Sequence, residues 1–551
     1  MELIDQHTKR IMEGCKERAR DAGLIFQDQT LEYIVTNKDI LELGPKSMIP
    51  TMYDYWVNDV EVLKEKGKYE LYPENPYETV INTRPAISFY NDNNPDWLNV
   101  MIFYHVLAHI DFFQNNLAFR HTWDEDFSAQ ALSDKRTIAQ LRAEKGRWLD
   151  YVIEFSRSID NLVDFFRILS NLNRPAQIQA SRKIDYYFDI FLQKVEKVSI
   201  SDYLKEINRY NEIIAHYGSA AESVFFSEII HKYPEFDAML EKYNRKPETD
   251  SPDLIRFLQV HSPFLNKSEN EWMKVVMGIV RRTSLYFQPQ IRTKILNEGW
   301  ASYWHDRLFM NDDRIRGNEV SYARINAKVT ALSRLGINPY ALGMRLLSYL
   351  EEIADRGRLC YDFQRIMDYR NRQQYDCKTQ GGLNFLFDVR KNCTDFTFIN
   401  TFVEQDFVDR YRLFVVGQRL NAEKGVMEYY VKSRKAADFK QMLIDSLYHP
   451  PHITVCNEKM KDGILYLDHK FEGKPLVQEY IANTMLGIEY LWGKKVLLET
   501  SEMVTEKTPT VDPMQQFPYY PPAKADIQEK EPAFKRVLYT MENKKLSKTF
   551  L

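Results

Sequence analysis

The sequence predicts a mainly α-helical N-terminal region followed by a smaller α+β domain, and two observations indicate this. Up to about Arg390, apolar residues recur at three- and four-residue spacing, which is typical of amphipathic helices. After about Phe385, short runs rich in Val, Ile, Tyr, Phe and Thr are separated by turn residues, which is typical of strands. We expect a helical domain over residues 1–390, an α+β domain over 391–500 and a Pro-rich extended tail over 501–551.

The helical region contains several well-marked helix candidates. The stretch from Trp97 to Phe113 is strongly apolar and follows Asn94-Pro95-Asp96, which is a helix start signal. Tyr243 to Pro252 is polar and Pro-containing, so it is expected to be an exposed loop between two helical blocks. Further helices are predicted at residues 182–197 and 201–217, within 253–309, and from Asn338 to about Gly357.

The α+β domain is predicted from five β-rich runs and two helix candidates. The helices are residues 434–448 and 476–492, and Gly493 follows the second as a plausible helix end. The prolines after about Ser501 block regular structure. The β-rich runs are FTFINTF, YRLFVVGQRL, MEYYVKS, HITVCN and GILYLDHKF.

Composition excludes several function classes. The formal net charge is -4, from 74 Lys and Arg against 78 Asp and Glu, so no nucleic-acid binding is predicted. No apolar run approaches the roughly 18 residues of a membrane span, and the charged N-terminus does not resemble a signal peptide. The 5 cysteines are scattered without a C-x-x-C pair, which predicts reduced thiols and a cytoplasmic protein.

Two segments carry residues that suit a metal ion. His105 and His109 lie four residues apart inside the first apolar helix candidate, so both imidazoles project from one face. Glu298 and His305 lie seven residues apart in a second predicted helix and therefore also share a face. Two His and one Glu form a common ligand set of catalytic zinc, so these helices predict a metallopeptidase-like helical site with His305 as fourth member.

One departure from the metallopeptidase pattern concerns the general base. Zinc peptidases with a glutamate ligand carry Glu directly after the first histidine, whereas Val106 stands there in this chain. Hydrolysis would then need another proton acceptor, such as Asp111 or Glu298 itself. Asp111 should point away from the metal face, because it lies two residues past His109, so a structural hydrogen bond is favoured for it.

His449-Pro450-Pro451-His452 is a second histidine pair with a different interpretation. The intervening prolines prevent the two side chains from sharing a helix face. We therefore interpret this segment as a loop.

At these motifs the sequence resembles the SpoVR (stage V sporulation protein R) family. The blocks that carry the resemblance are PAISFYNDNN with HVLAHIDFFQNN, YFQPQIRTKILNEGWASYWH, INPYALGMRL, and LDHKFEGKPL with YLWGKKVLLET. They occur in order between about residues 10 and 500. One departure is Gln114, where the family usually has a basic residue.

The resemblance implies a role in spore cortex formation or in a stress response. It also implies two partners, a PrkA-type serine kinase and a YhbH-type protein. Two functions remain open. One is a zinc-dependent hydrolase or acyl-transfer enzyme acting on a peptide or amide bond, in peptidoglycan or a γ-glutamyl linkage. Its ligands would be His105, His109 and Glu298, with His305 as ligand or oxyanion stabiliser. The other is a non-catalytic regulatory or scaffold protein with a structural metal.

Overall fold

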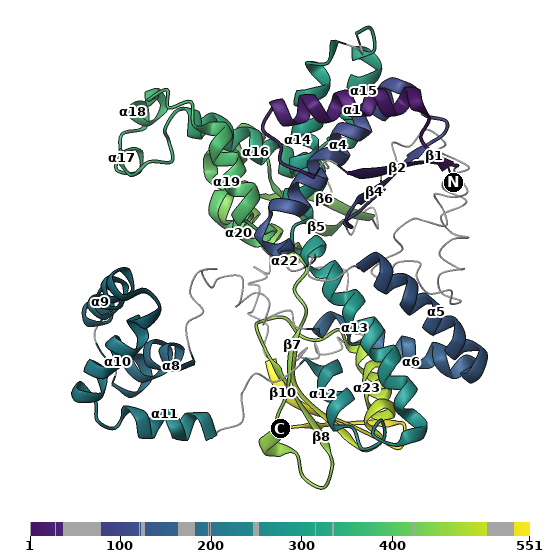
Figure 1. Ribbon diagram of the computed structural model, residues 1–551, viewed down its shortest axis with the longest axis vertical. Coiled ribbons are helices and arrows are strands. Elements are labelled where there is room, and N and C mark those ends of the chain that lie inside the picture. Colours follow the sequence, from purple (N-terminus) through teal and green to yellow (C-terminus); the bar gives the residue numbers. More distant parts are fainter. Residues whose placement is uncertain are drawn as a thin grey trace, which may run out of the picture.

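The computed structural model confirms a mainly helical protein with a smaller sheet-containing C-terminal region (Figure 1). It describes residues 2–551 except 28, 37–78, 121, 123–126, 164–181, 197, 199, 246–252, 314–315, 333–335, 422–425 and 504–533. In the part of the chain so described, no helix combines the length and the apolar character that crossing a membrane requires.

Three helices form the centre of the first hydrophobic core: α4 (Asp96–Asn115), α14 (Lys294–Met310) and α16 (Pro339–Asp355). Helix α4 is apolar on every side, and its residues from Leu98 to Phe113 are all buried, as expected for a helix inside a core. Asn338 caps α16 by accepting from the backbone N–H of Ala341, which confirms the predicted helix start.

The backbones of α14 and α16 touch at Gly299 and Gly343. A Cβ atom added to Gly299 would overlap the backbone of Gly343, and one added to Gly343 would overlap the carbonyl oxygen of Ile295. Only glycine allows this approach, because any side chain would push the helices apart. The crossing fixes the position of the α14 turn that carries Glu298.

A small sheet beside α4 was not predicted from the sequence. Its strands are β1 (Glu2–Leu3), β2 (Thr30–Val35), β3 (Thr79–Ile81) and β4 (Ala86–Asn91), in the order β1-β2-β4-β3. Strands β2 and β4 pair in parallel, and the other pairs are antiparallel. Helix α1 (Gln6–Asp21) connects β1 to β2 and packs against α4.

The second core lies between helices and a five-stranded sheet (Figure 1). The sheet order is β11-β10-β9-β8-β7, with β8 and β9 parallel. Its strands are β7 (His452–Val455), β8 (Leu465–Lys470), β9 (Val496–Met503), β10 (Phe534–Glu542) and β11 (Lys545–Phe550). The helices are α5 (Phe127–Lys145), α6 (Arg147–Arg157), α12 (Leu254–His261), α13 (Glu271–Arg292) and α23 (Gln478–Trp492).

A third, aromatic core belongs to a separate helical unit at the lower left of Figure 1. Its elements are α8 (Arg182–Asp185), a π-helix (Tyr186–Val195), α9 (Ile200–Tyr217), α10 (Ala221–Lys232) and α11 (Phe236–Arg245). The helices predicted at 182–197 and 201–217 therefore exist, the first mostly as a π-helix. The loop predicted from Tyr243 falls largely on residues 246–252, which lie outside the described residues.

The remaining elements complete the first core and its surroundings. They include α15 (Glu319–Val329), α17 (Tyr361–Gln364), α18 (Tyr369–Gln374), α19 (Gly382–Asn392), α20 (Asp395–Phe402), α21 (Gln405–Arg410), α22 (Ala436–Ser446) and the ribbon of β5 (Val415–Asn421) and β6 (Val426–Ser433). Residues of α19, α20, α21 and α22 belong to the first core. The two cores therefore do not divide at residue 390, where a domain boundary was predicted.

Two sequence-based predictions near the C-terminus are wrong. FTFINTF was predicted as a strand but lies in α20, whose start is fixed by a capping box between Thr394 and Thr397. The tail was predicted to be extended over 501–551, but residues 534–550 form β10 and β11, because Val537, Tyr539 and Met541 bury alternate side chains in the second core. The prolines lie within 504–533, outside the described residues.

Candidate metal centre

The structure brings His105, His109 and Glu298 together. Helix α4 presents both imidazoles one turn apart, and α14 packs against α4 with its Glu298 carboxylate toward them. Glu298 Oε2 lies 3.7 Å from His105 Nε2 and 3.5 Å from His109 Nε2. One ligand atom from each of the three residues lies within 4.8 Å of the other two.

A hydrogen bond donated to Asn297 sets the tautomer of His109. His109 Nδ1 lies 2.9 Å from Asn297 Oδ1, which can only accept, so Nδ1 carries the hydrogen. In the neutral ring the lone pair is then on Nε2, the atom that faces Glu298. The residue before Glu298 thus orients a histidine of the other helix.

A longer chain of hydrogen bonds sets the tautomer of His105. Asn326 in α15 donates from Nδ2 to Asp306 Oδ1 at 2.9 Å, and its Oδ1 accepts from His305 Nε2 at 3.0 Å. His305 Nδ1 must then accept, and it does so from His105 Nδ1 at 2.8 Å. The lone pair of a neutral His105 is therefore also on Nε2, facing Glu298.

His305 lies beside the cluster in contact with His105, and its predicted role as a fourth member stays a prediction. Both of its ring nitrogens are directed at other side chains, Nδ1 at His105 and Nε2 at Asn326. These contacts favour a role in orienting His105 over a role as fourth ligand. Sequence spacing could not distinguish the two roles, because both need the same helix face.

The cluster lies in a nearly dry environment. The side chains of His105 and His109 are 3% and 5% exposed, and that of Glu298 is 17% exposed. Tyr340 stacks on His105 with ring centroids 6.0 Å apart, and Phe113 stacks on His109 at 5.9 Å. The centre is therefore closely packed and is most exposed on the side of Glu298.

Asp111 has the structural role that the sequence favoured. Its carboxylate accepts from Trp300 Nε1 at 2.9 Å and from the backbone N–H of Ile25 at 2.8 Å, and it lies 3.4 Å from Arg390 Nε. Burial raises the pKa of Asp111 to about 6, against the lowering effect of Arg390 and the hydrogen bonds. Asp111 ties α4 to α14 and α19 on the side away from the histidines.

Asp395 supports the centre and was missed by the sequence analysis. Its carboxylate accepts from the backbone N–H groups of Ile295 and Leu296 at 2.9 and 2.8 Å, in the first turn of α14. Burial raises the pKa of Asp395 to about 7, and the nearby Glu298 contributes to the rise. No local signal could have identified this cap, because it comes from a segment 100 residues further along the chain.

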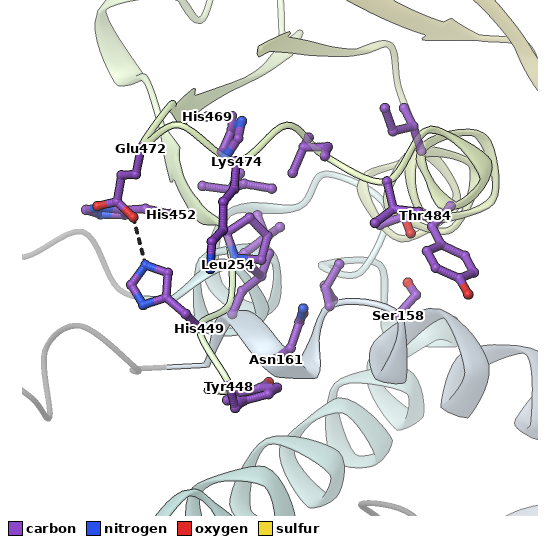
Figure 2. Close-up of a pocket in the computed structure, with 18 of the residues that line it drawn as sticks. Ser158, Asn161, Leu254, Tyr448, His449, His452, His469, Glu472, Lys474 and Thr484 are labelled. Atoms are coloured by element: carbon purple, nitrogen blue, oxygen red, sulfur yellow. Dashed lines mark hydrogen bonds and ion pairs between the residues drawn. The ribbon is translucent and has the colours of Figure 1, made fainter. Parts of the chain in front are cut away.

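As predicted, the two histidines of the second pair, His449 and His452, do not share a helix. His449 lies before β7 and pairs with Glu472 at 2.7 Å (Figure 2), whereas His452 is the first residue of β7. Among the described residues, His105, His109 and Glu298 form the one group of three side chains that could hold a metal ion.

The fold and the site define a mainly helical protein with a buried His-His-Glu cluster on two crossing helices. The model of the family described as "SpoVR like protein" matches residues 3–449, so the chain belongs to the SpoVR family. It is also similar to a protein of Escherichia coli (strain K12) named "Uncharacterized protein YcgB", at 21% identity over 493 residues, covering 85% of this chain and 86% of that protein. No solved structure matches the chain.

Proposed function

We propose that the protein holds a divalent metal ion, zinc, between His105 Nε2, His109 Nε2 and the Glu298 carboxylate. The separation of these atoms is the observation that carries the proposal. Two ligand atoms bound to one tetrahedral zinc lie about 3.3–3.6 Å apart, given bond lengths of about 2.0–2.2 Å. The distances of 3.5 and 3.7 Å from Glu298 Oε2 to the two Nε2 atoms are close to this spacing and longer than a normal hydrogen bond.

The hydrogen-bond chains support the same proposal. Asn297 and His305 direct the hydrogen of each imidazole to Nδ1, so two lone pairs and a carboxylate face one small volume. Three acceptors in a buried site repel each other unless a metal ion or a proton lies among them. Second-layer bonds of this kind are usual at histidine ligands of metals.

The reaction we propose is hydrolysis of a peptide or amide bond, with a peptidoglycan-related or other peptide substrate. Three protein ligands leave a coordination position for water or substrate, and a bound zinc ion supplies Lewis acidity. His105, His109 and Glu298 hold the ion, while Asn297 and His305 orient the two imidazole rings through hydrogen bonds. Glu298 is the most exposed ligand, so its side is the approach for a substrate.

A structural metal in a regulatory or scaffold protein is the second candidate. Val106 occupies the position of the usual general base and is fully buried. The nearly buried position of the cluster also suits a metal ion that holds α4 and α14 together without taking part in a reaction. Membership of the SpoVR family supports the further proposal that the protein acts in sporulation or a stress response beside a PrkA-type kinase and a YhbH-type protein.

Metal analysis of the purified full-length chain tests the centre. We expect one equivalent of zinc by mass spectrometry in the wild type, and loss of that ion in His109→Ala and Glu298→Ala variants. His216→Ala, at an exposed position of α9, is the matched control and should keep the ion. A wild type that takes up no divalent ion after incubation with zinc, manganese or iron(II) would show that the proposed centre does not exist.

Activity separates the two candidates. The zinc-loaded wild type and the Glu298→Ala variant would be incubated with purified peptidoglycan and with a fluorogenic peptide library. New amino groups released only by the wild type would support the hydrolase. If the wild type keeps its ion but releases no amino groups, the result supports the structural role instead.

A further inference from the structure

Between α16 and α19 the chain leaves the first core and returns to it. This excursion, residues 356–381, carries the short helices α17 and α18 and extends away from α16 and α19 (Figure 1). It contains two of the 5 cysteines, Cys360 and Cys377, and both thiols are free and exposed. The functions proposed above do not use them.

Two consecutive residues at the start of the excursion hold both cysteine backbones. The backbone N–H of Cys360 donates to the carbonyl of Gly357 at 3.3 Å. The backbone N–H of Cys377 donates to the carbonyl of Arg356 at 3.0 Å. A Cβ atom added to Gly357 would lie 3.2 Å from Cys377 Cβ and 3.9 Å from Cys377 Sγ. The two cysteines, 17 positions apart in the sequence, therefore lie on either side of Gly357.

Tyr375 contacts both thiols. Its hydroxyl oxygen lies 3.2 Å from Cys360 Sγ, and side-chain hydrogen bonds with Cys360 and with Cys377 raise the pKa of Tyr375 above its ordinary value. Both sulfurs therefore reach the same phenolic oxygen. A disulfide needs the two Sγ atoms about 2 Å apart, so the thiols must turn from the tyrosine toward each other, which their exposed positions allow.

Cys360 has the features of an oxidant-sensitive thiol. Hydrogen bonds from the Tyr375 hydroxyl and from the backbone N–H of Phe363, at 3.4 Å, lower its pKa, so more of it is the nucleophilic thiolate. Burial has the opposite effect on Cys393, whose pKa it raises. Exposed cysteines with a lowered pKa are the ones that oxidants modify first, above all next to a second thiol.

We propose that Cys360 and Cys377 form a peroxide-sensitive disulfide site. In the first step the Cys360 thiolate attacks an oxygen of hydrogen peroxide, so an S–O bond forms, the O–O bond breaks and hydroxide leaves. In the second step the Cys377 sulfur attacks the sulfenic acid of Cys360. The S–S bond forms, and the oxygen leaves as water with the proton of Cys377. The two thiols lose two electrons, which the peroxide gains.

The product closes residues 360–377 into a covalent loop that contains α17 and α18. Exposed disulfides are readily reduced by thiol exchange, so this one would be reversible. The proposal does not depend on the metal centre, because His105, His109 and Glu298 lie outside the excursion.

Peptide mapping of the full-length protein tests the proposal. The reduced protein would be treated with hydrogen peroxide, alkylated with iodoacetamide and digested with trypsin. Trypsin releases Cys360 in residues 359–365 and Cys377 in residues 373–378, so the disulfide joins two peptides. We expect this linked pair after peroxide and its loss after dithiothreitol. Absence of the pair, or equal amounts of pairs that contain Cys456, would overturn the proposal.

The order of the two steps has its own variant. Cys377→Ser removes the second thiol, so dimedone, which traps sulfenic acids, should label Cys360 at least about threefold more than in the wild type. Cys456→Ser is the matched control and should form the linked pair as the wild type does. Equal labelling of Cys360 in the wild type and in Cys377→Ser would show that Cys377 does not react with the sulfenic acid.

The shared hydroxyl is tested by Tyr375→Phe. We expect the linked pair to form about two- to tenfold more slowly, because one hydrogen bond to the Cys360 thiolate is lost. Tyr361→Phe, an exposed tyrosine next to Cys360, should leave the rate unchanged. Equal rates in the two variants would contradict the role of Tyr375 in this site.

Discussion

At the scale of single residues, Asn297 and His305 determine what the two histidines of the candidate centre can do. Both accept the Nδ1 hydrogen of a histidine on α4 and so direct its Nε2 lone pair toward Glu298. A ring without such a partner can flip or change tautomer, which reduces its value as a ligand.

Replacing Asn297 tests this orientation. Asn297→Leu removes the acceptor for His109 Nδ1, so on the proposed function we expect zinc affinity to fall about 10- to 100-fold. Competition with a chromogenic chelator measures the affinity, and circular dichroism verifies the fold. Asn311→Leu, exposed at the end of the same helix, should leave the affinity unchanged, and equal affinities in both variants would contradict the role of Asn297.

Glu499 in β9 provides a pH-dependent test of the second core. Burial alone would raise its pKa, but hydrogen bonds from Lys459, Tyr466 and Arg536, each 2.6 Å long, lower the pKa to about 2. Because the folded value lies below the ordinary value of 4.5, its stabilising effect is full above pH 4.5 and is lost as the pH falls toward 2.

We therefore expect Glu499→Gln to destabilise the protein by about 1–3 kcal/mol at pH 7. The difference from the wild type should shrink as the pH is lowered from about 4.5, because the wild-type carboxylate then becomes protonated. Urea unfolding of both proteins at several pH values measures this difference in the free energy of unfolding. A difference that stays constant down to pH 2 would show that the network does not stabilise the charged form.

Sequence patterns predicted the residues that lie at the candidate centre. They did not predict the hydrogen-bond partners that decide the role of each residue. Helical spacing places His105 with His109 on one face, and the structure brings Glu298 to them. The part played by His305 depends on Asn326, which lies in another helix, and the cap at Asp395 comes from still farther along the chain. Roles that depend on such partners are fixed by tertiary packing and leave no periodic signal.

At the scale of elements, the crossing of α14 and α16 is the contact on which the centre depends most. We expect Gly299→Ala to lower the free energy of unfolding by about 3 kcal/mol or more, because its Cβ would overlap the backbone of Gly343. The same change should weaken zinc binding, since Glu298 is the preceding residue.

Gly278→Ala is the matched control for that prediction. Gly278 lies inside α13, and an added Cβ would come no closer than 3.4 Å to a side-chain atom of Gln259. Alanine favours a helix over glycine by up to about 1 kcal/mol, so this variant should be neutral or slightly more stable. Thermal unfolding of both variants measures the contrast, and equal midpoints would show that α14 and α16 can separate without cost.

Elements with a strong period and a start signal were predicted well, and short ones were not. The apolar helix at Trp97 and the helix after Asn338 both exist, since their patterns extend over several turns. FTFINTF consists of β-formers, yet its capping box and packing against α22 make it a helix. The N-terminal sheet was missed because its strands are short and separated by a helix.

At the scale of the whole molecule, the C-terminal strands β10 and β11 belong to the second core. Val537 in β10 is fully buried there, so Val537→Asp should destabilise the protein by about 3 kcal/mol or more. Leu546→Asp in β11, at a position 37% exposed, should change stability by less than about 0.5 kcal/mol. Urea unfolding compares the two, and a similar effect of both would contradict the placement of β10.

The contact between Gly299 and Gly343 also bears on how an ion would be taken up. Many small zinc domains acquire their shape only on loading, because nothing else holds the ligands together. Here the turn of α14 that carries Glu298 contacts the main chain of α16 directly, with no side chain between them. Its position is therefore set by this contact and does not depend on a bound cation. Loading would then fill a preformed site, and chelation would empty it while the helices stay where they are.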